Sequence, residues 1–410
     1  MKPQTEFMED ESRLGSGKSD GSDKSDASDM SDKLGAHDIA TFRKKHFPEV
    51  GDELWNDWRW QLRNRFRDME GLSRVFRLSQ AERAAVARRA GPSLPVGITP
   101  YYASLIPPND PDDQLRRTMV PRLQEFDIQP WERTDPLGEE AHSPLPGLVH
   151  TYPHKVLFLA TDFCATYCRY CTRSRMVGAG EFLPDKHLWE QALRYIREHT
   201  EIRDVLLSGG DPLILADDRL EWLLSRLRTI PHVEIIRIGS KLPAVLPQRV
   251  TPALARLLGA YAPLWLSLHF THPRELTPES ALACGRLADA GIPLMSQTVL
   301  LAGVNDDSET LADLFQGLLR LRVKPYYLHQ CDPVAGSSHF KTSVQHGLRL
   351  LSGLHGRLTG YAIPHYMIDA PGGGGKVPVS PNHVVGRDGN DLLLSNYRGE
   401  VYRYPDPDLT

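Results

Sequence analysis

Short apolar runs alternate with amphipathic stretches over residues 155–330. The runs that predict strands are KVLFLATD (155–162), DVLLSGGD (204–211), VEIIRIGS (233–240), PLWLSLHF (263–270), LMSQTVLL (294–301) and VKPYYLHQ (323–330). Stretches with helical spacing lie between them, and in one of these Leu220, Leu223, Leu224 and Leu227 share a helix face. Strands that alternate with helices pair in parallel, so this pattern predicts an α/β fold. Six units are fewer than the eight of a complete barrel, which leaves an open sheet or a partial barrel.

The part of the chain before this pattern, residues 37–150, is expected to be helical and interrupted by prolines. One amphipathic helix is predicted from the apolar positions Leu54, Trp55, Trp58, Leu62 and Phe66. A second helix is expected after Ser79, which is a suitable N-cap because Glu82 follows three residues later. Residues 101–123 contain four prolines and should therefore cover a surface rather than form a core.

The two ends of the chain differ from both of these parts. Residues 1–36 consist largely of Ser, Asp, Gly and Lys, cannot bury apolar area, and are predicted to form a disordered tail. Residues 360–404 are predicted to form strands and turns, with RDGND (387–391) as the turn of a hairpin. The expected organisation is a tail at 1–36, a helical region at 37–150, a partial barrel at 151–345 and a small β-rich C-terminal segment at 346–410.

Composition argues against several classes of function. The net charge of −4 favours neither nucleic acid nor an acidic membrane surface as a partner. No apolar run reaches the roughly 18 residues that a membrane-spanning helix needs, and the N-terminus has no apolar core like that of a secretory signal. Five cysteines are an odd and low number for a disulfide framework, so a reducing cytoplasm is expected.

Three of the five cysteines, Cys164, Cys168 and Cys171, lie on one short segment directly after the first predicted strand. Three thiolates on one loop can converge on a single inorganic centre. A closed zinc site usually takes four ligands in two pairs, and a cubane iron–sulfur cluster usually takes four cysteines. A fourth ligand could come only from Cys284 or Cys331, and neither lies in a second such motif. Three ligands would leave one iron open to another molecule, which favours a catalytic cluster over zinc or over incidental cysteines.

A second unusual segment, DAPGGGGKVPVSPN (369–382), contains four consecutive glycines followed by Lys376. Consecutive glycines cost backbone entropy and allow close approach of the chain to a ligand. A lysine beside such a loop can form a Schiff base, and pyridoxal 5′-phosphate (PLP) is the cofactor that such a lysine would carry. A flexible loop that ends in a solvated lysine is the alternative on these residues alone.

The cysteine spacing after the first strand of an alternating fold resembles the radical S-adenosylmethionine (SAM) superfamily. In that superfamily the open iron binds SAM, which is then cleaved to a 5′-deoxyadenosyl radical. The segment LLSGGDP (206–212) supports this resemblance, because Gly209 and Gly210 stand where the superfamily has a glycine-rich segment. A glycine pair alone is weak support, since a plain turn after a strand would also use it.

Several further segments occur in order: ITPYYASLIPPNDPDDQLRR, LSLHFTHPRELT, VLLAGVNDD and KPYYLHQCDPVAGSSHF. Together with the cysteine and lysine segments, they make the chain from about Trp55 to Tyr404 resemble the lysine 2,3-aminomutase family. The resemblance implies a radical SAM partial (β/α)6 barrel that binds a [4Fe–4S] cluster, SAM and PLP. It also implies an electron donor such as flavodoxin or ferredoxin, and a homo-oligomer.

The resemblance also implies which residues hold the cofactors. The three cysteines would hold the cluster, and Lys376 would be the catalytic lysine that binds PLP. Gly209 and Gly210 would contact the amino group of SAM. His269 and Gln297 lie at predicted strand ends and are further candidates for contacts with SAM, although a buried core histidine explains His269 equally well.

Three residues resemble those that hold the substrate in the family. Arg173 would bind the substrate carboxylate, for which a bidentate guanidinium is well suited, and Asp332 and Asp369 would receive a distal ammonium. A surface arginine and two structural acids are the alternatives. Some members also bind zinc through a C-terminal cysteine group, but this chain has no cysteine after Cys331 and carries Asp307 at the position of another zinc ligand. No structural zinc is therefore expected.

The activity implied is the conversion of L-lysine to β-lysine, with the amino group moved from Cα to Cβ. The same chemistry on arginine is the nearest alternative, whereas the two acids argue against glutamate. A relative that makes β-lysine for elongation factor P is a third reading. A non-catalytic iron–sulfur protein would be expected to lose a cluster cysteine or Lys376, and a plain PLP transferase would not need the cysteines.

Overall fold

The computed structural model describes residues 39–88, 94–178, 180 and 184–407. The chain divides into two units, residues 1–36 and 37–410, and every described residue belongs to the second. The tail predicted at residues 1–36 lies outside the described residues. None of the helices in the described part combines the length and apolarity that crossing a bilayer requires.

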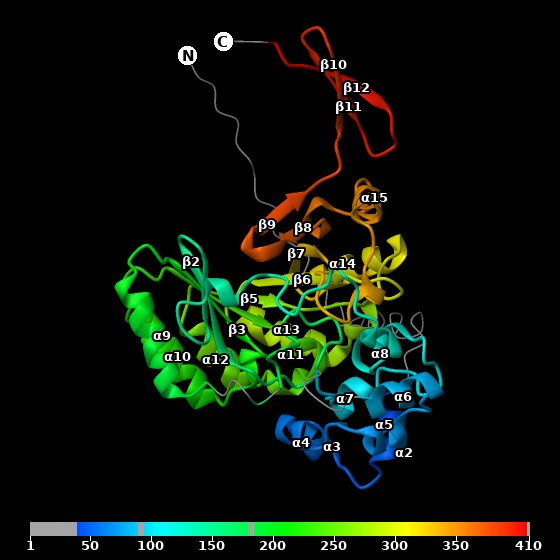
Figure 1. The fold of residues 1–410 in the computed structure, drawn as a ribbon, viewed down its shortest axis with the longest axis vertical. Helices are drawn as coiled ribbons and strands as arrows, with labels where there is room; N and C mark the ends of the chain where they lie inside the picture. The colour runs from blue at the N-terminus through cyan, green and yellow to red at the C-terminus, as the bar shows by residue number, and fades with distance from the viewer. Residues whose placement is uncertain (1–38, 89–93, 179, 181–183, 408–410) are drawn as a thin grey trace, which may run out of the picture. The chain divides into compact units, whose positions relative to one another are not determined.

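A nine-stranded sheet is the main element of the described residues (Figure 1). Its strands follow in chain order: β1 (Leu148–Tyr152), β2 (Lys155–Thr161), β3 (Asp204–Gly209), β4 (Ile235–Ser240), β5 (Leu264–Leu268), β6 (Leu294–Leu300), β7 (Val323–Gln330), β8 (His365–Ala370) and β9 (Gly375–Val379). Strands β2 to β8 are parallel, whereas β1 and β9 are antiparallel to their neighbours. The six predicted strands are confirmed as β2 to β7. No pairing joins β1 to β9 in the described residues, so the predicted partial barrel is confirmed.

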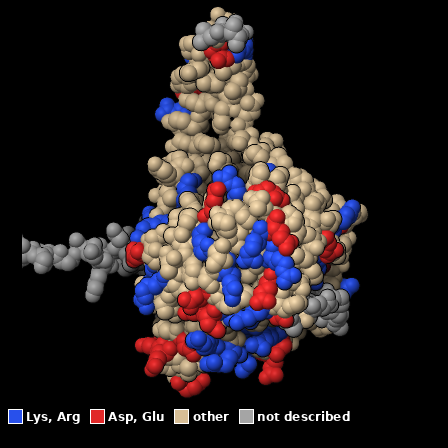
Figure 2. Space-filling view, turned by 90° about the vertical axis from the view of Figure 1, so that its left-hand side faces the viewer, with Lys and Arg blue, Asp and Glu red and all other residues tan. Residues whose placement is uncertain are grey.

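Helices follow the strands, as the alternating pattern predicts. The α-helices are α9 (Lys186–Glu198), α10 (Asp217–Arg228), α11 (Leu242–Val245), α12 (Pro252–Gly259), α13 (Pro278–Asp289), α14 (Ser308–Arg320) and α15 (Val344–Leu354). Short 3-10 helices are η3 (Pro212–Ile214), η4 (Pro247–Arg249), η5 (Pro273–Glu275), η6 (Ser338–Phe340), η7 (Gly360–Ala362) and η8 (Pro371–Gly373). The predicted leucine face of α10 is completely buried. On the face shown in Figure 2, acidic and basic side chains are interspersed.

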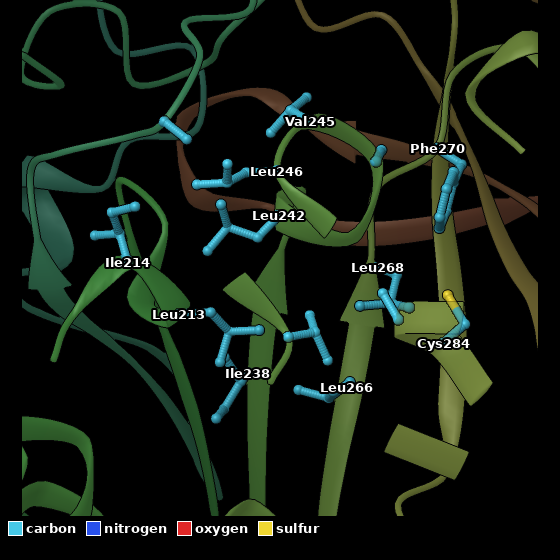
Figure 3. Close-up of a cluster of buried hydrophobic side chains, with 14 of the residues drawn as sticks. Leu213, Ile214, Ile238, Leu242, Val245, Leu246, Leu266, Leu268, Phe270 and Cys284 are labelled. Carbon is cyan, nitrogen blue, oxygen red and sulfur yellow. The ribbon is translucent and has the colours of Figure 1, made fainter. Parts of the chain in front are cut away.

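Apolar side chains pack on the outer side of the strands. Figure 3 shows Ile238 of β4 and Leu266 and Leu268 of β5 beside Leu242 of α11, and all of them are fully buried. Burial of each such side chain contributes about 1.5–3 kcal/mol. Because successive residues of a strand point to opposite faces, this packing directs the alternate positions to the interior of the barrel.

The N-terminal region is helical, as predicted. It contains α2 (Ile39–His46), α3 (Asp52–Trp55), α4 (Trp58–Arg63), α5 (Met69–Val75), α6 (Gln80–Arg88), α7 (Pro100–Ala103), α8 (Gln114–Met119), η1 (Leu123–Phe126) and η2 (Glu140–His142). The single helix predicted over residues 54–66 is wrong. The side chain of Asp57 accepts a hydrogen bond from the amide of Arg59 and begins α4 as a separate helix. Leu54 is therefore exposed, while Phe66 pairs with Ile98 in a short bridge and is buried.

The helix start predicted at Ser79 is confirmed. The Glu82 amide lies 3.2 Å from Ser79 Oγ, and the Ser79 amide donates to Glu82 Oε2 at 2.7 Å. These two hydrogen bonds form a capping box. The same carboxylate also forms a buried ion pair with Arg116 of α8, with Nε to Oε1 at 2.8 Å. This ion pair joins the capped helix α6 to α8.

The proline-rich segment at 101–123 forms core, so the prediction that it covers a surface is wrong. Tyr101 and Tyr102 are fully buried. Tyr102 donates to Glu275 at 2.7 Å, and the Tyr101 hydroxyl lies 2.6 Å from Thr277 Oγ1. The prolines do interrupt the helices, but the two tyrosines before them contact the segment that follows β5, and Leu115 and Met119 between them are buried. Proline content constrains the backbone without deciding which side chains become buried.

A separate three-stranded antiparallel sheet follows the main sheet, and the predicted small β-rich C-terminal segment is confirmed. Its strands are β10 (Val384–Asp388), β11 (Asp391–Ser395) and β12 (Val401–Pro405). Asp388 pairs with Asp391, so the hairpin turn predicted at RDGND is also confirmed. Helix α15 crosses the predicted boundary at residue 345, and β8 and β9 continue the main sheet beyond it.

Candidate active site

A cavity of about 580 Å³ occupies the interior of the partial barrel. Alternate strand positions line it, for example Asp204, Leu206 and Ser208 of β3, because successive side chains point to opposite faces. The lining includes these residues that the sequence singled out: Arg173, His269, Gln297, Asp332, Asp369 and Lys376. They come from six different strands or the segments that follow them. Tertiary structure therefore brings together the residues expected to bind substrate and PLP.

Lys376 and Asp369 face each other across two neighbouring strands. They are directly opposite in the antiparallel pair of β8 and β9. Lys376 Nζ lies 2.8 and 2.7 Å from the two carboxylate oxygens of Asp369. The Lys376 amide also donates to the Tyr152 hydroxyl at 2.8 Å. Strand register and this backbone contact hold the lysine at the cavity.

The glycine run builds the turn that creates this register. Gly372 and Gly373 have φ values of 70° and 87°, which favour glycine. A Cβ on Gly373 would lie 2.1 Å from the ring of His142, and one on Gly375 would lie 2.9 Å from the Tyr152 hydroxyl. These glycines therefore let the backbone pack closely against other parts of the protein, namely His142 and Tyr152. Gly373 and Gly375 also line the cavity.

The two candidate acids differ in protonation. Burial and, after it, the charge of Asp369 raise the pKa of Asp332 to about 7. Burial also acts to raise the pKa of Asp369, but the hydrogen bond from His329 and the Lys376 ammonium outweigh it and lower this pKa to about 2. His329 Nδ1 lies 3.4 Å from Asp369 Oδ2. Asp369 is thus ionised at every physiological pH, whereas Asp332 gains or loses a proton near neutrality.

Arg173 is held by an acid that sequence reasoning missed. Its Nε and Nη2 lie 3.0 and 2.7 Å from Glu139 Oε1, and its Nη1 donates to Ser208 Oγ at 3.2 Å. Glu139 is only 7% exposed in its side chain. Glu139 takes Nε–H and one hydrogen of Nη2, and Ser208 takes one hydrogen of Nη1, so one hydrogen on each of Nη1 and Nη2 remains for a second carboxylate. Nothing in the local sequence marks Glu139, which is 34 residues away from Arg173.

The three cysteines follow β2 on one loop and are free thiols. Burial raises the pKa of Cys171 to about 11, with a further contribution from Cys168. Burial also raises the pKa of Cys164, and the charges of Asp211 and the other two cysteines add to it. Iron binds the thiolate, so a bound cluster would have to offset both the burial of these thiols and the repulsion between their thiolates.

A single metal ion fits these residues less well than a cluster. No three His, Cys, Asp or Glu side chains in the described part of the chain are arranged around one ion. A cubane cluster instead distributes its thiolates over different irons. Asp307 caps α14 by accepting a hydrogen bond from the Thr310 amide at 2.9 Å. Its position at the start of a helix gives it a structural role.

Gly209 and Gly210 pack the end of β3 against the start of the cysteine loop. A Cβ on Gly209 would lie 2.0 Å from the Thr161 carbonyl oxygen, and one on Gly210 would lie 2.3 Å from that of Phe163. The Gly210 amide donates to the Thr161 carbonyl at 2.5 Å. Any larger residue at either position would displace the loop that carries the cysteines. Their expected contact with SAM stays a prediction.

His269 and Gln297 both line the cavity, which distinguishes His269 from a core histidine. His269 directly follows β5, whereas Gln297 lies in the middle of β6 and not at its end as predicted. Burial and, after it, neighbouring cations, Lys241 first among them, lower the pKa of His269 to about 3. The imidazole is therefore neutral and can donate or accept one hydrogen bond to a ligand.

Two cations in the cavity were also missed. Lys155 of β2 and Arg237 of β4 line it. Arg237 Nε lies 2.8 Å from Asp204, and Lys155 Nζ lies 3.9 Å from the ring centroid of Tyr152. Burial lowers the pKa of Lys155, and the charges of Arg237 and Lys376 lower it further. Charged residues in otherwise apolar strand segments were a signal that could have identified both.

Comparisons with known proteins agree with this arrangement. Residues 351–410 match the family described as lysine-2,3-aminomutase, and residues 158–315 match the radical SAM superfamily. The L-lysine 2,3-aminomutase of Clostridium subterminale is 47% identical over 365 residues, which cover 89% of this chain and 88% of that protein. The L-lysine 2,3-aminomutase of Acetoanaerobium sticklandii is 47% identical over 90% of this chain and 89% of its own. A glutamate 2,3-aminomutase of Clostridioides difficile is 41% identical over 87% of this chain and 84% of its own. The chain therefore belongs to the lysine 2,3-aminomutase family of radical SAM enzymes.

Proposed function

We propose that this chain is an isomerase that converts L-lysine to β-lysine by moving the amino group from Cα to Cβ. Its cofactors are a [4Fe–4S] cluster, SAM and PLP. The observation that carries the proposal is the single cavity that joins Arg173, Asp332, Asp369 and Lys376 inside the barrel. An α-amino acid with a distal cation matches these groups, because it presents one carboxylate and one ammonium.

Each cofactor has a matching set of residues in the chain. The three cysteines would hold the cluster, Gly209 and Gly210 would border SAM, and Lys376 would bind PLP covalently. Lys155 lies within electrostatic reach of both Arg237 and Lys376, and all three line the cavity, which suits Lys155 and Arg237 to the PLP phosphate. When bound, the cluster and SAM supply a radical that removes an unactivated hydrogen, and PLP supplies a carbon–nitrogen double bond through which nitrogen migrates.

The residues of the chain orient the substrate for this chemistry. Arg173 would bind the α-carboxylate through the guanidinium edge that Glu139 leaves free. Asp332 and Asp369 would bind the distal ammonium. Holding both ends of the substrate fixes Cβ in one place, and such orientation accounts for much of the rate that enzymes achieve. His269 is neutral and would contact SAM or PLP without adding a positive charge to the site.

Substrate class depends on the two acids rather than on overall similarity, since a glutamate 2,3-aminomutase is also 41% identical. Two nearby carboxylates repel a third carboxylate, so glutamate should be rejected. Arginine also presents a distal cation and is the second candidate.

Anaerobic incubation of the reconstituted enzyme with lysine, arginine and glutamate, followed by product analysis, is expected to give β-lysine. Faster turnover of arginine than of lysine would overturn lysine as the substrate.

Replacement of either acid is expected to lower kcat/KM for lysine strongly. Loss of one partner of a desolvated charge pair costs about 2–5 kcal/mol, which is roughly 30-fold to several-thousand-fold in kcat/KM. Asp332→Asn and Asp369→Asn are the test variants. Asp289→Asn is the matched control, because Asp289 is exposed and pairs with Arg322 outside the cavity. Parent-like kcat/KM in both test variants would show that the acids do not select the substrate.

The pH dependence of kcat/KM for lysine is expected to follow Asp332. Its pKa is about 7, so the carboxyl is protonated below this pH and cannot bind an ammonium as an anion. The value of kcat/KM should therefore rise as the pH rises through about 7. Asp369 has a pKa of about 2 and should add nothing in this range. The rise should be absent in Asp332→Asn and present in Asp289→Asn; a rise that persists in Asp332→Asn would assign it to another group.

Other features of the enzyme are proposed from the family and the sequence. The reductant would be a flavodoxin or ferredoxin, and the chain would form a homo-oligomer. All five cysteines are free, which suits a reducing cytoplasm. The helical region at 37–150, the radical SAM barrel at 151–345 and the segment at 346–410 that carries the PLP lysine are proposed as the parts of the chain.

A further inference from the structure

The cysteine loop is bound on one side by the helical N-terminal region, which supplies none of the three thiols. Arg65 lies two residues after the end of α4 and donates from Nη1 to the carbonyl oxygens of Cys164 at 2.7 Å and Ala165 at 3.3 Å. Its guanidinium also lies 4.4 Å from the ring centroid of Phe163. Arg65 is thus joined to three consecutive residues at the start of the loop, although about 100 residues separate them in sequence.

A second contact holds the middle of the loop. Arg169, between the second and third cysteines, has a side chain only 2% exposed. Its Nε donates to Glu125 of η1 at 2.9 Å, and Nη2 donates to the other oxygen of the same carboxylate. Nη1 donates to the carbonyls of Leu94 and Pro95 at 3.2 and 3.1 Å. The Arg169 amide donates to the Thr118 carbonyl at 2.8 Å.

These contacts matter because the loop has no regular structure to hold it. Residues 162–178 contain only turns and bends, so the backbone of the loop depends on contacts with neighbouring segments. The end of β3 holds the loop from the barrel side at Gly209 and Gly210. Arg65 and the ion pair of Arg169 with Glu125 hold the loop from the side of the helical N-terminal region. Residues 39–126 lie outside both segments that match family descriptions.

We propose that Arg65 and Glu125 are positioning residues that keep the cysteine loop in the shape that retains the iron–sulfur cluster. The inference rests on the assignment of the three cysteines to that cluster, within the proposed function. Neither residue touches iron; each acts through loop backbone or through Arg169. The helical region would then serve as a holder of the cluster, and cluster retention would depend on residues far from the barrel in sequence.

The experiment compares iron loss from the reconstituted full-length enzyme under anaerobic challenge with a chelator. The variants are Arg65→Met, which removes the hydrogen bonds to two carbonyls, and Glu125→Gln, which removes the charge that pairs with Arg169. Arg67→Met is the matched control, because Arg67 is an exposed neighbour whose side chain donates to the Leu62 carbonyl outside the cysteine loop. Loss of a hydrogen bond from a charged donor predicts iron release roughly ten- to a hundredfold faster than in the parent.

Two further quantities are measured in parallel. PLP content is measured on the reconstituted chains, and thermal unfolding is measured on the cofactor-free chains. PLP content should match the parent in the two test variants, since Lys376 lies on β9. Glu125→Gln should unfold at a lower temperature than the parent, because it leaves the buried Arg169 without its charged partner. Arg65→Lys should restore part of the retention. Parent-like iron release in both Arg65→Met and Glu125→Gln would overturn the proposal. So would a parallel loss of iron, PLP and thermal stability, because that result would indicate general unfolding. A parent that holds the cluster but isomerises no amino acid would refute only the proposed function, whereas a parent that binds no cluster would refute both.

Discussion

Replacement of Cys168 by alanine is expected to abolish the iron–sulfur cluster and, with it, cleavage of SAM. Only three cysteines lie on the loop, and the remaining two, Cys284 and Cys331, are buried elsewhere as core thiols. Burial raises the pKa of both to about 12, so neither is a ready substitute ligand. Two thiolates cannot hold a cubane cluster that already has one open iron. The variant should therefore contain little iron after anaerobic reconstitution.

The measurements are iron and sulfide content, the electron paramagnetic resonance spectrum of the reduced protein with and without SAM, and formation of 5′-deoxyadenosine. The parent is expected to show one four-iron cluster whose spectrum changes when SAM is added. Cys284→Ala is the matched control, because it removes a buried thiol from α13 and should leave the cluster intact. PLP content should be unchanged in Cys168→Ala. Full iron content in Cys168→Ala would refute the assignment of the cysteines.

Replacement of Lys376 by alanine is expected to abolish covalent binding of PLP and all isomerase activity. The Nζ of Lys376 is the amine at the cavity that strand register holds opposite Asp369, and its side chain is 34% exposed there. Such an amine is accessible to a carbonyl group of a cofactor. The parent should absorb visible light as a PLP Schiff base, and borohydride reduction should fix the cofactor to the peptide that contains Lys376.

Lys341→Ala is the control for this experiment. Lys341 Nζ donates to the Cys331 carbonyl at 3.0 Å and should carry no PLP. Lys376→Ala should retain its cluster and its SAM-dependent spectrum, because the cysteine loop follows β2 and not β9. Recovery of the reduced label on Lys341, Lys155 or another lysine would refute the role of Lys376. Loss of the cluster in Lys376→Ala would show that the two sites depend on each other.

Local sequence signals were sufficient for the parts of the fold that local physics controls. The alternation of apolar runs and amphipathic stretches predicted strands β2 to β7, because the strand face that packs against the helices requires apolar residues at every second position. Ser79 and Glu82 predicted a helix start that depends only on neighbouring amides. The prediction of one helix across residues 54–66 was wrong because the side chain of Asp57 caps a new helix, and apolar spacing alone does not reveal this cap.

Burial and polar partners over long distances could not be predicted in this way. Tyr101 and Tyr102 are core residues because they meet Thr277 and Glu275, which are more than 170 residues later. Proline spacing carries no information about such partners. The same limit applies to Glu139, whose role as the partner of Arg173 arises only when η2 packs beside the cysteine loop.

By itself, the sequence of this protein determined the chemistry: three thiols on one loop after a strand, a lysine after four glycines, and two acids. These are properties of residue type and spacing, which the chain carries in any conformation. Only the tertiary structure decided their arrangement in space. It placed Asp369 opposite Lys376 through the register of two strands, and it placed Lys155 and Arg237 in the same cavity. It also separated the pKa values of Asp332 and Asp369, because burial and neighbouring charge exist only after distant segments have packed together.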